Sequence, residues 1–206
     1  NIVDDFKKGM YSVAASHGIA GSKTNTVVFG WSLTQQGKKE ELETIQEIAK
    51  LNKNILLLHF NKTISRKKDK RIDIWWGGLE ANGDLMLMLS YLIRLNNDWL
   101  RTTINIFSIV DTEEEKRKSE NQIQKSIFDA RINANVNLFL RKNRKFITLL
   151  HKKSSQADLV FLGLKLRISD YDKTIQTIDH IIDGLKAVVF VQNNSMANDI
   201  PAIFNK

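Results

Sequence analysis

Short apolar runs and amphipathic segments alternate along most of the chain. The apolar runs are continuous, which is typical of strands buried on both faces of a parallel sheet. They cover residues 26–31, 54–60, 72–76, 102–110, 136–140, 158–164 and 186–191. Helical spacing of apolar residues predicts helices over residues 2–17, 35–51, 84–95, 112–131, 141–154 and 169–183. The pattern predicts an α/β fold, with a mainly parallel sheet sandwiched by helices.

The chain is expected to form two similar α/β lobes, residues 1–111 and residues 112–206. Residues 25–30 (NTVVFG) and 158–163 (DLVFLG) share one pattern, and each run precedes an expected helix. Thr112 and Glu115 have the spacing of a capping box, so a helix should begin there. A length of 206 residues is compatible with one domain made of two closely packed lobes.

The most hydrophobic stretch is residues 71–95, which begins with a strand, Ile-Asp-Ile-Trp-Trp. Neighbouring side chains on a strand point to opposite faces, so Trp75 and Trp76 should fill the two helix layers. A turn is expected next, because glycine and asparagine tolerate positive φ; its residues are Gly77, Gly78, Asn82 and Gly83. The following helix is apolar on every side, which predicts complete burial. It is shorter than the roughly 20 apolar residues that span a bilayer.

Composition adds a strong basic charge to this picture. The formal net charge is +8, and cysteine is absent, which excludes disulfides and thiolate metal sites. The basic residues form two clusters, Arg66, Lys67, Lys68, Lys70 and Arg71, and then Arg141, Lys142, Arg144 and Lys145, followed by Lys152 and Lys153. Anionic lipid and nucleic acid both attract such clusters, and solvated loops and helix faces also carry them. Charge alone does not choose among these three interpretations.

The sequence lacks the motifs of the common catalytic and metal sites. Residues 21–24 (GSKT) lack the glycine spacing of a phosphate loop, and they run from a helix to a strand. The histidines, which are His17, His59, His151 and His180, contain no pair at metal-binding spacing. No nucleophile elbow is present. We therefore expect neither a metal site nor enzymatic activity, and an α/β enzyme is a weak alternative.

One ligand site is suggested by the fold class. Ligands of open parallel sheets bind beyond the carboxyl ends of the strands. The first two expected strands end at residues that could hold an adenine nucleotide, namely Gly30, Trp31, Ser32, His59, Asn61 and Lys62. Ordinary loops would also produce these residues. Any bound ATP would be a regulatory ligand, and no other cofactor is expected.

Three segments of the chain carry motifs of one known family. The first comprises residues 72–76, the leucine- and methionine-rich segment after them, Trp99 and a strand ending in Ile106-Phe107. The second is residues 25–31 (NTVVFGW), which are similar to N-T-V-V-L-G-W, and the third is residues 157–162, which are similar to a late strand. Together the three segments resemble the cytosolic C-terminal domain of the cation-chloride cotransporters. The signature residues, to which a structural role is assigned, are Asn25, Thr26, Asp73, Trp75, Trp76 and Trp99. The chain departs from the family by replacing its D-G-G turn with residues 80–84, and by having Ser90 where animal members usually have proline.

The resemblance implies a fold of two lobes like that of the universal stress proteins. It also implies a non-catalytic domain for regulation and dimerisation at the cytoplasmic face of the cell membrane. The membrane domain of a prokaryotic-type transporter of the Na/K/Cl symport family would precede residue 1. Expected partners are that transport domain, a second copy of the chain and inner-leaflet lipid head groups, without nucleic acid. The main alternative is a free-standing nucleotide-binding protein of the stress-protein type, and a basic nucleic-acid binder is another.

Overall fold

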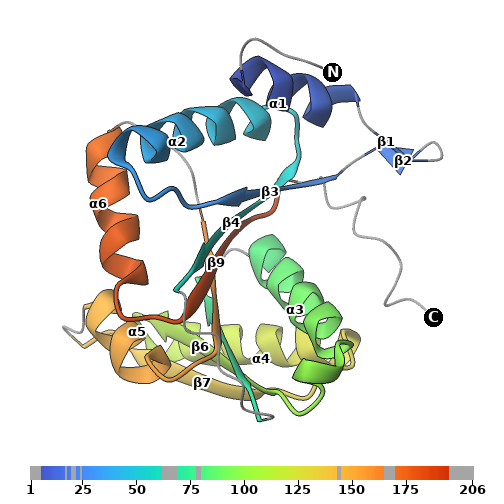
Figure 1. The fold of residues 1–206 in the computed structure, drawn as a ribbon. Coiled ribbons are helices and arrows are strands. Elements are labelled where there is room, and N and C mark those ends of the chain that lie inside the picture. The colour runs from blue at the N-terminus through green and yellow to red at the C-terminus, as the bar shows by residue number, and fades with distance from the viewer. Residues whose placement is uncertain are drawn as a thin grey trace.

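The computed structural model describes residues 6–16, 18–19, 22–23, 25–61, 69–77, 80–142, 145–164 and 170–194. Within these ranges, seven strands form one sheet in the order β3-β4-β9-β8-β5-β6-β7 (Figure 1). Neighbouring strands are parallel except for β4 and β9, which run antiparallel. The predicted α/β fold with a mainly parallel sheet is therefore confirmed.

The strands of this sheet follow the apolar runs closely. They are β3 (Thr26–Gly30), β4 (Asn54–Phe60), β5 (Arg71–Trp76), β6 (Thr103–Val110), β7 (Asn135–Leu140), β8 (Leu159–Gly163) and β9 (Ala187–Gln192). A separate pair, β1 (Gly18–Ile19) and β2 (Ser22–Lys23), is antiparallel and was not predicted. Two residues per strand are too few to produce a recognisable alternation of polar and apolar positions.

The helices are α1 (Phe6–Ser16), α2 (Gln35–Ala49), α3 (Glu80–Arg94), α4 (Glu113–Asp129), α5 (Phe146–Ser154) and α6 (Tyr171–Ile182), with a short 3-10 helix η1 (Asn97–Trp99). The predicted capping box at the start of α4 is present, because the Thr112 hydroxyl accepts from Glu115 N–H and the Glu115 carboxylate accepts in return. Helix α5 begins at Phe146, later than the predicted residue 141. Residue Lys142 has a positive φ of 34°, which is incompatible with helix.

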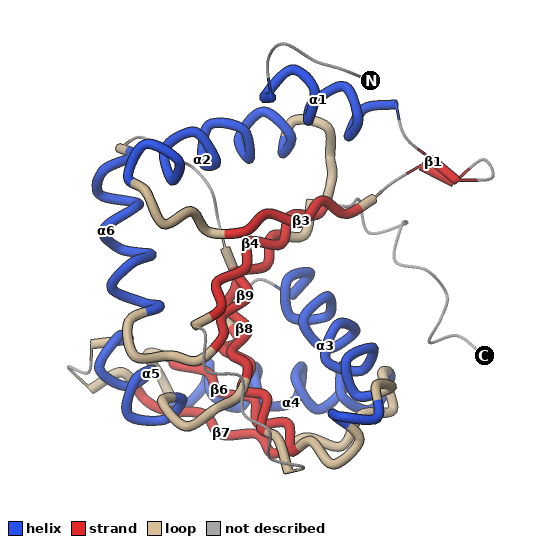
Figure 2. Tube along the Cα trace, in the orientation of Figure 1, coloured by secondary structure: helices blue, strands red, loops and turns tan. Residues whose placement is uncertain are grey.

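The sheet separates two hydrophobic clusters, one on each face. Helices α1, α2, α5 and α6 cover one face, and α3 and α4 cover the other (Figures 1 and 2). Trp75 belongs to the first cluster and Trp76 to the second. The two tryptophans therefore fill opposite helix layers, as the alternation of strand side chains predicts.

Helix α3 differs from its prediction in two respects. It begins at Glu80, so Asn82 and Gly83 lie inside the helix and do not form a turn. A Cβ at Gly83 would lie 2.3 Å from Cζ2 of Trp76. The glycine is thus required by the close approach of the indole, and a positive φ is not the reason for it.

The expectation that α3 is buried on every side is also wrong. Leu85, Met86 and Leu87 are buried against the sheet, whereas Leu92 and Leu95 are 47% and 61% exposed. Within the described residues, no further layer lies over this outer side of the helix (Figure 2). Exposed apolar side chains gathered in this way are typical of contact surfaces.

The predicted boundary between residues 111 and 112 stays a prediction. Strand β6 ends just before it and β7 follows it, and the two are neighbours in the sheet. Strands β8 and β9 lie between β4 and β5, so both residue ranges contribute to one continuous sheet. None of the described helices is both long and apolar enough to cross a membrane.

Candidate functional site

The predicted ligand residues lie where β3 and β4 end. The two strands are parallel neighbours, so their carboxyl ends meet, and Trp31 N–H donates to the Leu58 carbonyl at 2.7 Å. Gly30 is exposed, and Ser32 and His59 are half-buried. Asn61 lies just beyond β4 and donates its N–H to the Lys186 carbonyl. Lys62 lies outside the described residues, and nucleotide binding here stays a prediction.

Helix α6 closes over these strand ends. The indole N–H of Trp31 donates to Asp179 Oδ1 at 2.9 Å, and Lys38 Nζ lies 2.7 Å from Asp179 Oδ2. Lys38 also lies over the Trp31 ring, 5.7 Å from its centroid. Trp31 and Lys38 are therefore engaged with a carboxylate of the chain itself. Sequence reasoning missed Asp179, because 148 residues separate it from Trp31 and no motif connects them.

Two titratable groups near these strand ends have shifted pKa values. Burial lowers the pKa of His59 below 6.5, and this outweighs the Asp179 carboxylate, which raises it; Lys38 lowers the pKa further. Burial raises the pKa of Glu41 above 4.5, although its bond from the Ser32 N–H opposes the shift. The folded protein therefore protonates His59 less readily than the unfolded chain does.

The His59 shift predicts a loss of stability on mild acidification. Near and below about pH 6.5 the unfolded chain binds more protons at His59 than the folded chain does, so the free energy of unfolding falls as pH falls until the folded chain is protonated as well. His59→Gln should lose less stability than the wild type between about pH 7.5 and about pH 5.5. Urea unfolding of both proteins at the two pH values measures this difference. Equal losses in the two proteins would contradict the assignment to His59, whereas the Glu41 contribution is common to both.

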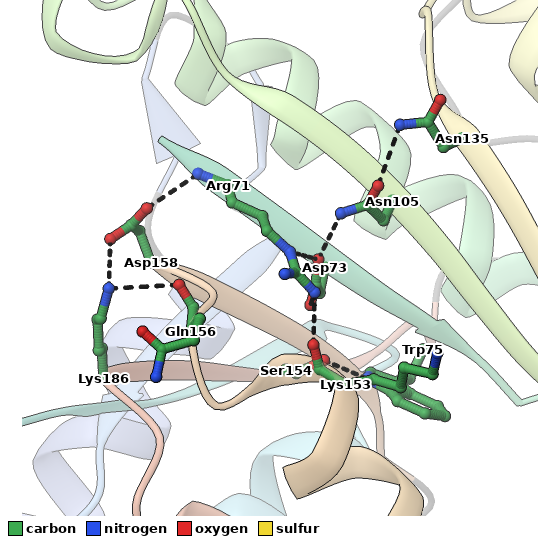
Figure 3. Close-up of polar contacts among 10 residues, drawn as sticks. All are labelled: Arg71, Asp73, Trp75, Asn105, Asn135, Lys153, Ser154, Gln156, Asp158 and Lys186. Carbon is green, nitrogen blue, oxygen red and sulfur yellow. Dashed lines mark hydrogen bonds and ion pairs between the residues drawn. The ribbon is translucent and has the colours of Figure 1, made fainter. Parts of the chain in front are cut away.

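A second polar cluster lies at the amino-terminal ends of β5, β6, β8 and β9 (Figure 3). Because β4 and β9 run antiparallel, these ends lie at the same edge of the sheet as the carboxyl ends of β3 and β4. The carboxylate of Asp73 is fully buried and binds the Arg71 guanidinium through two hydrogen bonds of 2.8 and 2.6 Å. Asn105 on β6 donates to the same carboxylate at 2.9 Å, and Asn135 on β7 donates to Asn105. The guanidinium also donates to the Lys153 carbonyl at the end of α5. One buried carboxylate thus connects three strands and a helix.

The network continues toward β8 and β9. Asp158 accepts from the Arg71 N–H at 3.0 Å and from Lys186 Nζ at 2.9 Å. The hydrogen bond to Asp73 raises the pKa of Arg71 above its usual value. Burial acts in the opposite direction, but its effect is smaller. Each of these charges has an opposite charge beside it. The arrangement stabilises the amino-terminal ends of the strands and offers no unpaired group for acid–base chemistry.

The remaining signature residues also have structural contacts. Trp75 donates its indole N–H to the buried Ser154 hydroxyl at 3.0 Å. Trp99 is half-buried, with Lys70 Nζ 4.6 Å from the centre of its ring. Thr26 donates to Asn25 Oδ1 at 2.9 Å at the start of β3. Of the basic clusters, residues 66–68 and 144 lie outside the described ranges, and Lys70 is largely buried instead of solvated.

A crevice of about 240 Å³ lies where β5, β6 and β8 end, and Trp76, Gly77, Gly163 and Arg141 are among its lining residues. From β5 the chain adds β6 and β7 on one side and later β8 and β9 on the other. Such a reversal point is where ligands bind in open α/β sheets. Sequence reasoning did not point to this crevice, because the strand order is not visible in the sequence.

Histidine and carboxylate side chains do not gather into a metal-binding group in the described part of the chain. His151 lies 3.1 Å from the Ile181 carbonyl through Nε2, and its ring centre is 6.1 Å from that of His180. His17 lies outside the described residues.

Comparison with known proteins identifies the family. The sequence model of solute carrier family 12 matches residues 32–144, which is more than half of the chain. The chain belongs to solute carrier family 12. The resemblance to the cation-chloride cotransporters is thereby confirmed. In this family member, the matched range includes the buried Asp73 and both neighbouring tryptophans.

The chain is similar to one relative of known name and to two solved structures. The family 12 chain is 30% identical over 135 residues to potassium/chloride cotransporter 3 of Caenorhabditis elegans; the match covers 61% of the chain and 12% of that relative. It thus spans about an eighth of the relative's length. The cytoplasmic domain of a prokaryotic cation chloride cotransporter has the same fold, with a TM-score of 0.69 at 17% identity over 93% of this chain and 70% of that one. A functionally unknown protein from Pseudomonas aeruginosa gives a TM-score of 0.45 at 11% identity, over 93% of this chain and 69% of that one.

Proposed function

We propose that this chain is a non-catalytic regulatory and dimerisation domain on the cytoplasmic side of a membrane cation-chloride cotransporter. The observation that carries the proposal is the fold, which agrees over 93% of the chain with the cytoplasmic domain of a prokaryotic member. The family match over residues 32–144 supports it independently. In this role the domain binds the transport domain of its own polypeptide and a second copy of itself, and inner-leaflet lipid attracts its basic clusters.

The internal chemistry of the domain supports a passive role. The buried carboxylate of Asp73 is satisfied by Arg71 and Asn105, and Asp179 is satisfied by Trp31 and Lys38. Groups poised for proton transfer or nucleophilic attack need an available lone pair or a proton directed at a substrate. These charges instead hold strands and helices in place. A domain built in this way is suited to transmit a conformational change to the transport domain.

Transport measurements on the complete cotransporter test the regulatory role. We expect removal of this domain to change the maximal rate of chloride-dependent rubidium uptake into vesicles, while the apparent affinities for the ions stay the same. The ion sites would lie in the membrane part, so their affinity should not depend on the domain. An unchanged maximal rate, with equal amounts of both proteins in the vesicles, would refute regulation. Turnover of a small molecule by the isolated domain would refute the non-catalytic role.

Dimerisation is tested separately on the isolated chain. Sedimentation velocity should give a mass near 47 kDa, which is twice the 23.7 kDa of one chain, at concentrations of tens of micromolar. Closed two-fold pairs are the commonest form of homo-oligomer. A mass of one chain at all accessible concentrations would mean that this part does not dimerise by itself.

A regulatory nucleotide is the second candidate function, and the crevice at the ends of β5, β6 and β8 favours it. Arg141 lies at its rim beside an exposed carboxylate, Asp111, and a guanidinium suits phosphate recognition. Isothermal titration of ATP into the wild type and into Arg141→Met tests this position. His59→Gln is the control for the ends of β3 and β4. Weakened binding in the control alone would place the nucleotide at the site expected from the sequence.

A further inference from the structure

Helices α3 and α4 end at the same corner of the fold. Helix α3 connects β5 to β6, and α4 connects β6 to β7. The three strands are parallel neighbours, and both helices cover the same face of the sheet (Figure 1). The carboxyl-terminal end of each helix therefore lies beside the amino-terminal end of the next strand. Because β6 and β7 are neighbours, the two helix ends lie next to each other.

Four exposed apolar side chains gather at this corner. Leu92 lies in the last turn of α3 and Leu95 follows that helix, whereas Leu100 follows η1 and Phe128 lies in the last turn of α4. Their exposed fractions are 47%, 61%, 56% and 81%, respectively. Single exposed apolar residues are ordinary on protein surfaces, but a group of them marks a contact site. We call these four residues the corner patch.

Basic residues are interspersed with the corner patch. Residues 91–101 and 122–134, which contain the patch, also contain four basic residues, namely Arg94, Arg101, Lys125 and Arg131. Two of them are direct sequence neighbours of Leu95 and Leu100, and the other two lie three residues before and after Phe128. The acidic residues of the same ranges are Asp98 and Asp129. Positive charge therefore prevails over negative charge around the exposed apolar side chains.

A lysine and a tryptophan lie at the base of the corner. Trp99 is half-buried in η1, between Leu95 and Leu100 in the sequence. Lys70, directly before β5, is only 9% exposed, and its Nζ lies 4.6 Å from the centre of the Trp99 ring. It forms no ion pair with a described residue, so its charge adds to the positive field. Side chains that combine an apolar body with a polar tip are favoured where protein meets a membrane surface.

We propose that the corner patch docks onto an anionic lipid bilayer: the apolar side chains enter the head-group region, and their basic neighbours contact lipid phosphates. The proposal rests on the proposed function, which places the domain beside a membrane. Membrane-surface binding increases both with the apolar area that leaves water and with the attraction of basic residues to anionic lipid. The corner supplies both contributions in the same few residues.

A second copy of this chain would fit the corner less well. Stable protein interfaces bury about 800 Å² on each partner, whereas the corner patch consists of a few exposed side chains with charged residues between them. Each copy also carries a net charge of +8, so two copies repel each other. An anionic bilayer attracts the same charge and can accept separate side chains between its head groups.

Vesicle binding tests the proposal on the 206-residue chain. Flotation with vesicles of phosphatidylcholine mixed with phosphatidylglycerol should recover the wild type, and vesicles of phosphatidylcholine alone should not. The double variant Leu100→Ser, Phe128→Ser should bind at least about tenfold more weakly, because two apolar side chains no longer leave water on binding.

The matched control removes one leucine and one phenylalanine elsewhere on the surface. It is the double variant Leu33→Ser, Phe60→Ser, whose residues are 90% and 57% exposed. They lie just after β3 and at the end of β4, and β9, β8 and β5 separate them from β6. This control should bind the mixed vesicles as tightly as the wild type does.

A fluorescent probe locates the contact directly. The chain has no cysteine, so Leu100→Cys can carry a single environment-sensitive nitrobenzoxadiazole group. Its emission should shift to shorter wavelength and gain intensity when the mixed vesicles are added. The same probe at Leu33→Cys should stay unchanged. If a serine variant fails to fold by circular dichroism, the comparison of these two probes decides.

Three results would overturn the proposal. The first is a wild type that does not bind the mixed vesicles. The second is equal binding by the two serine double variants, or an equal response of the two probes. The third is a shift of the Leu100 probe that grows with protein concentration in the absence of vesicles, which would assign the patch to a second copy. Failed vesicle binding together with a transport rate that still changes on removal of the domain would refute the docking alone and leave the regulatory role standing.

Discussion

Replacing Arg71 with methionine is expected to lower the free energy of unfolding by about 3–5 kcal/mol, because a buried carboxylate then loses its counter-charge. Asp73 is completely buried, and its only charged hydrogen-bond donor in Figure 3 is Arg71. Asn105 would remain as a neutral donor. Methionine retains most of the apolar side chain of arginine, so the loss should report the charge and not the packing.

Chemical denaturation with a matched control measures this effect. The control is Arg141→Met, since the pair of Arg141 and Asp111 is exposed, at 54% and 61%. Exposed pairs contribute about 0–1 kcal/mol. Combining Arg71→Met with Asp73→Leu should recover much of the lost stability, because the uncompensated charge is removed as well. A loss no larger than that of the control would show that the buried pair is not a major support of the sheet.

The sequence predicted the secondary structure well where burial dominates. Strands β4 and β9 are buried between helices on both faces, so their sequences are continuous apolar runs. Such runs can be recognised without a structure. The Thr112–Glu115 capping box is a local interaction within four residues, so it too could be identified directly. The opposite directions of Trp75 and Trp76 follow from strand geometry alone.

Arrangement in space could not be predicted in the same way. The antiparallel junction of β4 and β9 joins residues more than 120 positions apart, and no local pattern specifies it. For the same reason, neither the hydrogen bond from Trp31 to Asp179 nor the crevice beside Arg141 could be predicted from the sequence. The pattern shared by residues 25–30 and 158–163 was visible in the sequence, but the parallel pairing of β3 with β4 and of β8 with β9 was not.

The error at the start of α3 has a particular cause. Glycine and asparagine are common in turns because they tolerate positive φ, and Asn82-Gly83 was interpreted in that way. In the structure Asn82 is buried, and its side chain accepts a hydrogen bond from the Asn193 N–H at 2.7 Å. Gly83 is needed where the helix meets the Trp76 ring. Both residues serve tertiary contacts, which a local pattern cannot distinguish from turn chemistry.

Gly83→Ala is therefore expected to destabilise the protein, although alanine normally stabilises a helix interior by about 1 kcal/mol relative to glycine. The new Cβ would lie 2.3 to 2.5 Å from three ring atoms of Trp76. The indole is 3% exposed and packed in the cluster beneath α3, so it cannot move aside without displacing its neighbours. Overpacking of this kind costs about 1–3 kcal/mol, which should exceed the gain in helix propensity.

Urea unfolding of two further proteins makes this prediction specific. Gly77→Ala is the control, because a Cβ at Gly77 meets no atom within 4 Å, and surface changes of this kind usually stay within about 0.5 kcal/mol. In a Trp76→Leu background the ring is absent, so Gly83→Ala should there become neutral or stabilising. That reversal is the coupling between two contacting residues that a double-mutant cycle isolates. If Gly83→Ala stabilises the protein with Trp76 in place, the close approach of the indole is not what excludes a side chain at this position.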